Sequence, residues 1–173
     1  RDLRVTDHQP LVTAAEQGLV CALYIVEPML WAEPDVSRRH YEFLTECLAQ
    51  LRADLAALGL PLCLRVGEAL AVFKTLHHTH PISCIHAHQE TGNWWTFQRD
   101  QAVLRWARQA GIVVQEAQHH GVVRRLSNRD GWSRLWYAYM NQSLAEVGPC
   151  TAVQGIQSDA LPSAAALGLA ADG

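Results

Sequence analysis

Residues 37–66 read SRRHYEFLTECLAQLRADLAALGLPLCLRV. Within them, apolar residues recur at alternating steps of three and four, which predicts one buried face on a helix over 37–58. Ser37 can cap the start of this helix, and Gly59 follows its end, where a left-handed residue is easily accommodated. The next run, 62–66, has no apolar–polar alternation, as is typical of a strand buried on both faces. The segment therefore predicts a helix followed by a buried parallel strand.

The same alternation of helices and apolar runs extends in both directions. We predict further helices over 10–17, 68–77 and 96–110, and further strands over 19–26, 82–85 and 112–114. This order predicts an α/β fold, a doubly wound (Rossmann-like) five-stranded parallel sheet with helices on both faces. Such sheets begin with a central strand, so we expect the first strand upstream of Arg1, because its absence would expose two unpaired edges. Finding residues 20–25 on a finished edge of the sheet would contradict this.

Beyond residue 118 the pattern loosens, with one further amphipathic helix over 132–144. From 147 to 173 the composition shifts to Ala, Gly, Leu, Ser and Pro with almost no charge. We therefore expect an α/β domain over 1–146 and an interdomain linker over 147–173.

Composition excludes several classes of protein. The chain has 173 residues, of which 49% are hydrophobic and 18% charged, so it can bury a core. A net charge of −3 argues against a free-standing nucleic-acid binder. No apolar run reaches the roughly twenty residues of a membrane span. The five cysteines lack CxxC spacing, which favours free thiols in a cytoplasmic protein without membrane contact.

The motifs of common cofactor sites are missing. Neither GxGxxG nor GxxxxGK[ST] occurs, which disfavours a conventional dehydrogenase or NTPase. Nine histidines are present, but no HExxH-type spacing accompanies them, so we expect no metal site. Residues 89–93 read QETGN and precede Trp94-Trp95, a combination that could hold a flat heterocycle. The alternative is a strand-to-helix loop with local caps.

Five segments, taken in order, resemble one family, the DNA photolyases and cryptochromes. They are RDLRVTDH (1–8), LYIVEP (23–28) with Trp31, HQETGN (88–93) with Thr96 and Arg99-Asp100, GVVRRL (121–126) with RDGW (129–132), and LPS (161–163) with LGL (167–169). The resemblance implies light-driven electron transfer from reduced FAD, which splits pyrimidine dimers in DNA. It also implies that FAD and damaged DNA bind a helical domain that follows the linker. This fragment would then not be catalytic alone, and its partner would be its own C-terminal helical domain.

The resemblance implies an antenna role for the α/β domain, with a second chromophore that passes excitation to FAD. Apolar side chains would hold its ring, acids and amides would bond its edge, and an arginine would pair with an anionic tail. Pro34 and Trp95-Thr96 depart from the folate-binding pattern, which favours a flavin or deazaflavin. The candidate residues carried over are Asp2, Arg4, Ile25, Val26, Glu27, Leu30, Arg38, Arg39, Gln89, Glu90, Asn93 and Arg99.

Two alternatives stay open at this point. One is a photosensory cryptochrome with the same domain and no repair activity, since the residues that would decide lie in the helical domain. The other is an unrelated nucleotide-binding α/β domain similar to universal stress proteins, although the glycine-rich phosphate loops of that class are missing.

Overall fold

A computed structural model describes residues 2–124 and 126–169. Arg1 and Arg125, which belong to two of the motifs above, lie outside the described residues, as does the end of the expected linker from 170 onward. The helices and strands are α1 (Gln9–Gln17), β1 (Leu19–Val20), β2 (Ala22–Val26), η1 (Leu30–Ala32), α2 (Arg38–Ala57), β3 (Leu62–Val66), α3 (Ala69–Thr79), β4 (Cys84–His88), α4 (Trp94–Gln109), β5 (Val113–Ala117), α5 (Trp132–Met140), β6 (Thr151–Ala152) and η2 (Ala165–Leu167).

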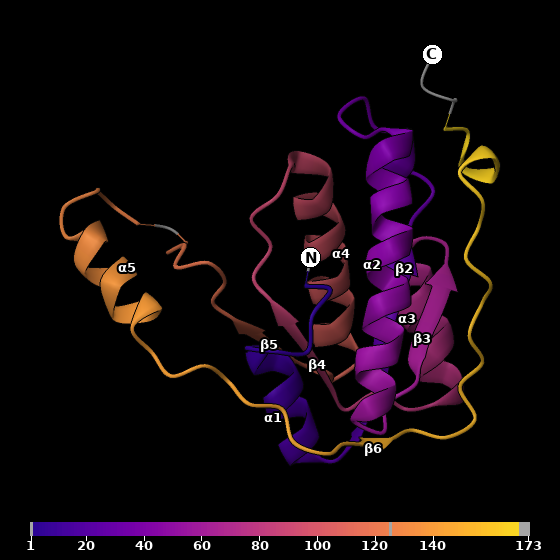
Figure 1. Ribbon diagram of the computed structural model, residues 1–173, viewed down its shortest axis with the longest axis horizontal. Coiled ribbons are helices and arrows are strands. Elements are labelled where there is room, and N and C mark those ends of the chain that lie inside the picture. The colour runs from indigo at the N-terminus through magenta and orange to yellow at the C-terminus, as the bar shows by residue number, and fades with distance from the viewer. Residues whose placement is uncertain (1, 125, 170–173) are drawn as a thin grey trace.

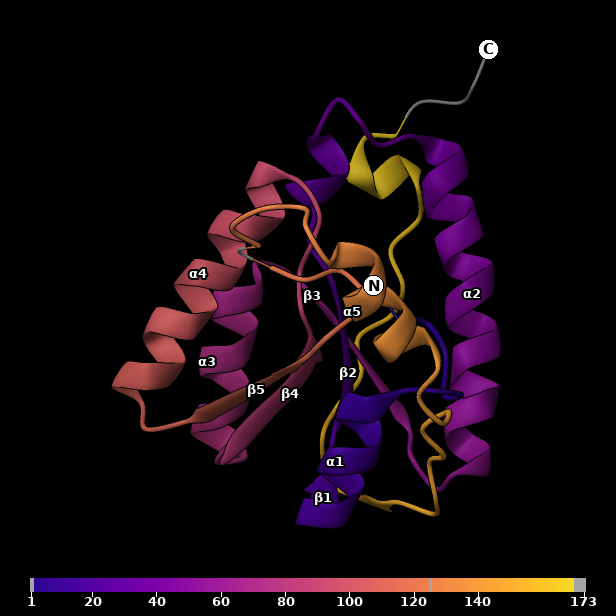
Figure 2. The same ribbon diagram turned by 90° about the vertical axis from the view of Figure 1, so that its left-hand side faces the viewer.

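Helix α2 confirms the prediction made from its periodicity. The Ser37 hydroxyl accepts a hydrogen bond from the His40 amide at 3.4 Å and caps the first turn. The apolar face is buried as predicted, at Tyr41, Leu44, Leu48, Leu51 and Leu55. Figure 2 shows the strands between α2 on one side and α3 and α4 on the other. Helices therefore cover both faces of the strands, as expected for an α/β fold.

The strands are parallel, but they do not form the expected single five-stranded sheet. β2 pairs with β3, β4 pairs with β5, and β1 pairs with β6, each as a separate two-stranded unit. Figure 1 shows the β4–β5 and β2–β3 pairs apart from one another. The physical reason is that the described residues provide no strand that hydrogen-bonds to both β2 and β4. The strand expected upstream of Arg1 stays a prediction.

Three strands differ from their predicted positions. The strand predicted over 112–114 lies at Val113–Ala117, where it pairs with β4. The predicted strand over 82–85 lies instead at Cys84–His88, because the Ile82 amide donates to Nδ1 of His77 and belongs to the turn after α3. The predicted strand over 19–26 is interrupted at Cys21, where its pairing changes from β6 to β3. These differences follow from pairing partners, which an apolar run does not specify.

The segment after α5 returns along the outer edge of β3. The amide of Asp159 donates to the Leu64 carbonyl at 2.7 Å, and its carboxylate accepts from the Val66 amide at 2.9 Å. The Tyr41 hydroxyl donates to the Pro162 carbonyl at 2.6 Å. Polar backbone groups on an exposed strand edge are thereby satisfied within the chain. The linker role of 147–173 stays a prediction.

The main core lies between α2 and the β2–β3 pair. Its completely buried large side chains are Tyr41, Leu60, Leu64 and Val26. Trp31 packs edge-on against Tyr41 with ring centroids 4.8 Å apart. Among the described helices, none has the length and apolar character needed to cross a membrane.

Replacing Asp159 by Ala should destabilise the chain by about 1–2 kcal/mol, because the Val66 amide loses its acceptor and Arg65 loses an ion pair. Urea unfolding followed by circular dichroism measures this difference. The matched control is Asp130→Ala at an exposed position, which should change the free energy of unfolding by less than about 0.5 kcal/mol. Equal effects of the two substitutions would show that the returning segment does not stabilise β3.

Candidate functional site

The carboxyl ends of the strands gather the chemistry-bearing side chains. Glu27 follows β2, His88 ends β4, and His119 comes two residues after β5. All three are buried polar side chains. In open α/β sheets this edge is the usual place for ligands. The polar side chains at this edge form two clusters, one around Arg99 and one around Asp2.

Arg99, on α4, joins three carboxylates. Its guanidinium lies 2.9 Å from Glu27 Oε2, 3.0 Å from Glu90 Oε2 and 2.9 Å from Asp100 Oδ1. The other oxygen of Glu27 accepts from the Ala69 amide at the start of α3, at 2.9 Å. Burial raises the pKa of Glu27, although Arg99 and the Ala69 amide oppose the shift. The sequence-predicted residues Glu27, Glu90 and Arg99 thus come together, bonded to one another.

The loop after β4 is held by its own polar groups. The Glu90 carboxylate accepts from the amides of Thr91 and Gly92 at 2.9 and 2.8 Å. Asn93 caps α4 by accepting from the Thr96 amide at 3.0 Å, and it donates to Asp35 at 3.2 Å. This part of the predicted site therefore shows the local capping that the alternative interpretation described.

The remaining predicted residues lie apart from these contacts. Arg38 pairs with Glu42 on α2 itself at 2.6 Å, and Arg39 is exposed on the same turn. Val26 is completely buried, whereas Ile25, Leu30 and Gln89 are half-buried. The Gln89 amide donates to the Ala117 carbonyl at 2.8 Å and so extends the β4–β5 ladder.

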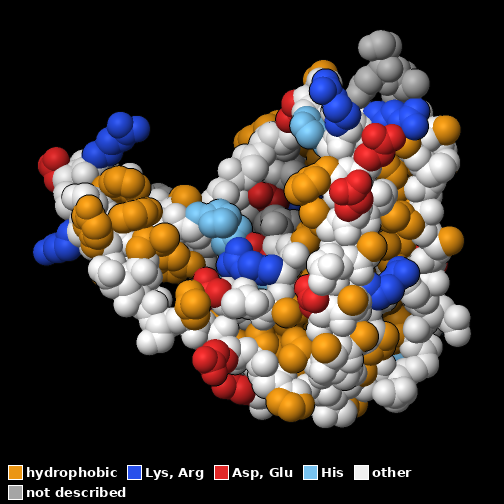
Figure 3. Space-filling view, in the orientation of Figure 1, with side chains coloured by type: hydrophobic (Ala, Val, Ile, Leu, Met, Phe, Trp, Pro, Cys, Tyr) orange, Lys and Arg blue, Asp and Glu red, His pale blue; other side chains and the backbone are white. Residues whose placement is uncertain are grey.

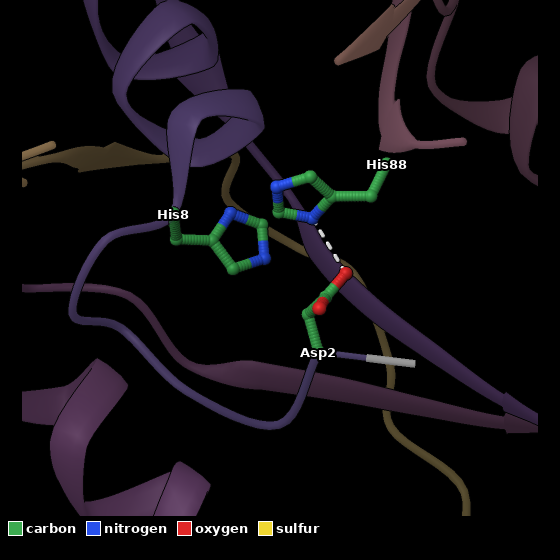
Figure 4. Close-up of side chains that lie close together, drawn as sticks. All are labelled: Asp2, His8 and His88. Atoms are coloured by element: carbon green, nitrogen blue, oxygen red, sulfur yellow. Dashed lines mark hydrogen bonds and ion pairs between the residues drawn. The ribbon is translucent and has the colours of Figure 1, made fainter. Parts of the chain in front are cut away.

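A second cluster surrounds Asp2, as Figure 4 shows for Asp2, His8 and His88. Asp2 Oδ2 is 2.5 Å from His88 Nδ1, and Oδ1 is 2.7 Å from His119 Nε2. The ring of His88 lies between those of His8 and His119, with centroid distances of 4.8 and 4.7 Å. Sequence reasoning selected Asp2 but missed the convergence of the histidines. The local signal was His88 itself, three residues after the strand predicted over 82–85.

The cluster perturbs the ionisation of its members. Burial opposes ionisation of Asp2, yet the hydrogen bond and charge of His88 hold its pKa well below the usual range. Burial, and next the charge of His88, lower the pKa of His8 to about 4. Burial also lowers the pKa of His119. The cluster at neutral pH therefore contains the Asp2 carboxylate beside a neutral imidazole at His8.

Arg4 borders a cavity of about 210 Å³ next to this cluster. The cavity is lined by Arg4, Asp7, His120, Trp136, Tyr139 and Met140. The side chain of Arg4 is 37% exposed, and its contacts with the carboxylates of Asp2 and Asp7 are 3.8 Å long. Its guanidinium also donates to the carbonyls of Thr6 at 3.0 Å and Asp7 at 2.9 Å. Figure 3 shows histidine side chains between the apolar side chains of α5 and the rest of the molecule. A cation and aromatic rings thus share one hollow.

A larger cavity, of about 500 Å³, lies between α3 and α4. Lys74, Trp95 and Arg99 contribute to its lining. The Arg99 guanidinium lies 5.8 Å from the Trp95 ring centroid. Arg99 is turned chiefly toward its carboxylate partners, so we consider the Arg4 cavity the better candidate for an anionic ligand.

Comparison with known proteins gives a consistent result. The sequence model described as DNA photolyase matches residues 1–134. Cryptochrome DASH of Gloeobacter violaceus is 34% identical over 111 residues, which cover 60% of this chain and 22% of that protein. The chloroplastic/mitochondrial cryptochrome DASH of Oryza sativa is 31% identical over 98 residues, which cover 52% and 17%. The match thus spans less than a quarter of the length of these relatives.

Two solved structures share the fold. An archaeal photolyase from Sulfolobus tokodaii, reported with two FAD molecules and the implication of a novel light-harvesting cofactor, superposes with a TM-score of 0.69 at 20% identity. That match covers 88% of this chain and 36% of the other. A bacterial class III photolyase from Agrobacterium tumefaciens gives 0.69 at 21% identity, covering 92% and 35%.

Replacing Arg99 by Met should cost about 3 kcal/mol of stability, because it leaves the carboxylate of Glu27 buried without its cation. The pKa of Glu27 should rise further, so the free energy of unfolding of the variant should fall as the pH rises from 4.5 toward neutrality. Urea unfolding across this pH range measures both effects.

Adding Glu27→Gln to the Arg99→Met variant should recover about half of the loss and remove its added pH dependence. Arg105→Met, an exposed position on the same helix, is the control for losing an arginine. A pH-independent loss in Arg99→Met would contradict this account of the ion pair.

Proposed function

The chain belongs to the DNA photolyase family, and from that premise we propose that it is the antenna-chromophore domain of a photolyase. Membership in this family excludes the alternative of an unrelated domain similar to universal stress proteins. In the proposal, catalytic FAD and damaged DNA bind a C-terminal helical domain, which is the partner of this one. Light-driven repair of pyrimidine dimers is then an activity of the whole protein.

The Arg4 cavity carries the proposal. It combines a partly exposed guanidinium with the rings of Trp136 and Tyr139 at the edge of the sheet where ligands bind. Arg99, by contrast, is 19% exposed and is held by three carboxylates. Arg4 is therefore the cation that we assign to the phosphate or carboxylate tail of the chromophore.

A flavin or deazaflavin fits the proposal better than folate. The Sulfolobus tokodaii photolyase, which shares the fold, is reported with two FAD molecules. Pro34 and Trp95-Thr96 depart from the folate-binding pattern of the family. We extend the two-flavin arrangement to this protein, with the second flavin in the present domain.

The residues of this domain would bind and orient the chromophore, which when bound supplies absorption of light and transfer of its energy to FAD. Trp136 and Met140 offer apolar contact to a ring, and Arg4 offers a charged donor to the tail. The Tyr139 hydroxyl is already engaged with the Gln118 carbonyl at 3.2 Å, which fixes the position of its ring.

Adding FAD or FMN to this chain should quench flavin fluorescence in a saturable way. Arg4→Gln should weaken the affinity about tenfold, the loss expected for one charge-assisted hydrogen bond. Arg105→Gln, at an exposed position on α4, should leave it unchanged. Absence of saturable quenching, or equal affinity of wild type and Arg4→Gln, would contradict the assignment of the cavity.

The second candidate function is photosensory, and the cryptochrome DASH relatives favour it. The two candidates differ in what the full-length protein does with reduced FAD, DNA that contains pyrimidine dimers, and blue light. Repair predicts loss of the dimers during illumination. Persistence of the dimers, with FAD shown to be reduced, would contradict the repair function and support signalling.

A further inference from the structure

We propose that Asp2, His8 and His88 form a binding site for a divalent transition-metal ion. One ligand atom from each side chain lies within 4.8 Å of the others. Figure 4 shows the three side chains converging from separate segments, namely the N-terminal segment, the start of α1 and the end of β4. Two imidazole nitrogens and a carboxylate oxygen suit Zn²⁺ and neighbouring first-row divalent ions.

Two of the donors carry or share a proton that a metal ion would displace. Nδ1 of His8 accepts from the Leu11 amide at 3.1 Å and caps α1, so Nε2 of His8 carries the ring proton. A metal bound at Nε2 moves this proton to Nδ1 and replaces the hydrogen bond from Leu11. Nδ1 of His88 and Oδ2 of Asp2 lie 2.5 Å apart, so an ion bound between them would replace the proton that they share.

The donors are buried, and a further nitrogen lies beside them. The side chains of Asp2 and His88 are only 7% and 2% exposed. Oδ1 of Asp2 lies 2.7 Å from Nε2 of His119, and a guanidinium nitrogen of Arg4 is 3.8 Å from the same oxygen. His119 is therefore placed to supply a further nitrogen to an ion on Asp2.

The spacing requires only a small rearrangement. Tetrahedral zinc with bonds of about 2.0–2.1 Å places its ligand atoms about 3.4 Å apart. The present separations reach from 2.5 Å between Asp2 and His88 to at most 4.8 Å. Side-chain shifts of about 1–1.5 Å therefore close the site around an ion.

The inference departs from the sequence-based expectation of no metal site. That expectation relied on the absence of a short ligand spacing such as HExxH, whereas these ligands come from three separate segments. It is also independent of the proposed function, because it requires neither a chromophore nor the helical domain. Its structural consequence is a link between the N-terminal segment, α1 and β4.

The test is a titration of the chelator-treated chain with ZnCl₂ by calorimetry, together with elemental analysis. We expect one ion per chain and a rise in melting temperature with the metal. His8→Asn should weaken binding at least tenfold while keeping the cap of α1, because Asn is a favoured N-cap residue. His78→Asn, an exposed position on α3, is the matched control and should bind as the wild type does.

Asp2→Asn is the second variant, since it keeps the size of the side chain and removes its charge, and it should also bind at least tenfold more weakly. Circular dichroism identifies a variant that has failed to fold, in which case the other one decides. Substitution with Co²⁺ gives an independent readout, because thiolate ligands produce a charge-transfer band that nitrogen and oxygen ligands lack. No saturable binding, unchanged affinity in a folded variant, or a thiolate band would overturn the proposal.

Discussion

The ion pair between Glu27 and Arg99 connects the two main parts of this domain, the β2–β3 pair with α2 and α3 and the β4–β5 pair with α4. Glu27 follows β2, and its carboxylate accepts a hydrogen bond from the Ala69 amide at the start of α3. Arg99 lies on α4, which leads from β4 to β5. Within the described residues no strand bonds to both pairs, so side-chain contacts must hold them together. Breaking this pair would leave an uncompensated buried charge, and it links the two strand pairs alongside the packing of α3 against α4.

The two arginines at the carboxyl edge of the strands, Arg99 and Arg4, differ in their surroundings. Arg99 is surrounded by carboxylates of the chain itself and serves the structure. Arg4 keeps more of its surface exposed and lines a cavity with aromatic rings, so it can serve a ligand. Asp2 lies next to Arg4, but its carboxylate oxygens face His88 and His119. Electrostatic surroundings, and not residue type, separate the arginine that we propose for binding from the structural one.

The returning segment shows how an edge strand is protected without a further strand. Asp159 offers both its backbone amide and its carboxylate to β3, and Ser158 accepts from the Leu64 amide at 3.0 Å. In the described part of this segment, up to residue 169, only the short β6 adopts regular pairing. A segment poor in charge, which the composition describes as a linker, thus covers a surface that would otherwise invite aggregation.

The sequence by itself determined the helices, the Ser37 cap and the α/β layering, as the buried face of α2 illustrates. These features depend on neighbouring residues, since periodicity reports which side of a segment is buried. The resemblance of its motifs to DNA photolyases and cryptochromes also predicted the family and selected Glu27, Glu90 and Arg99 as site residues. Only the tertiary structure decided which strands pair, which partners Arg99 takes, and that Asp2 meets His88 across 86 positions. Those contacts arise from chain topology, because no local pattern encodes which distant segments become neighbours.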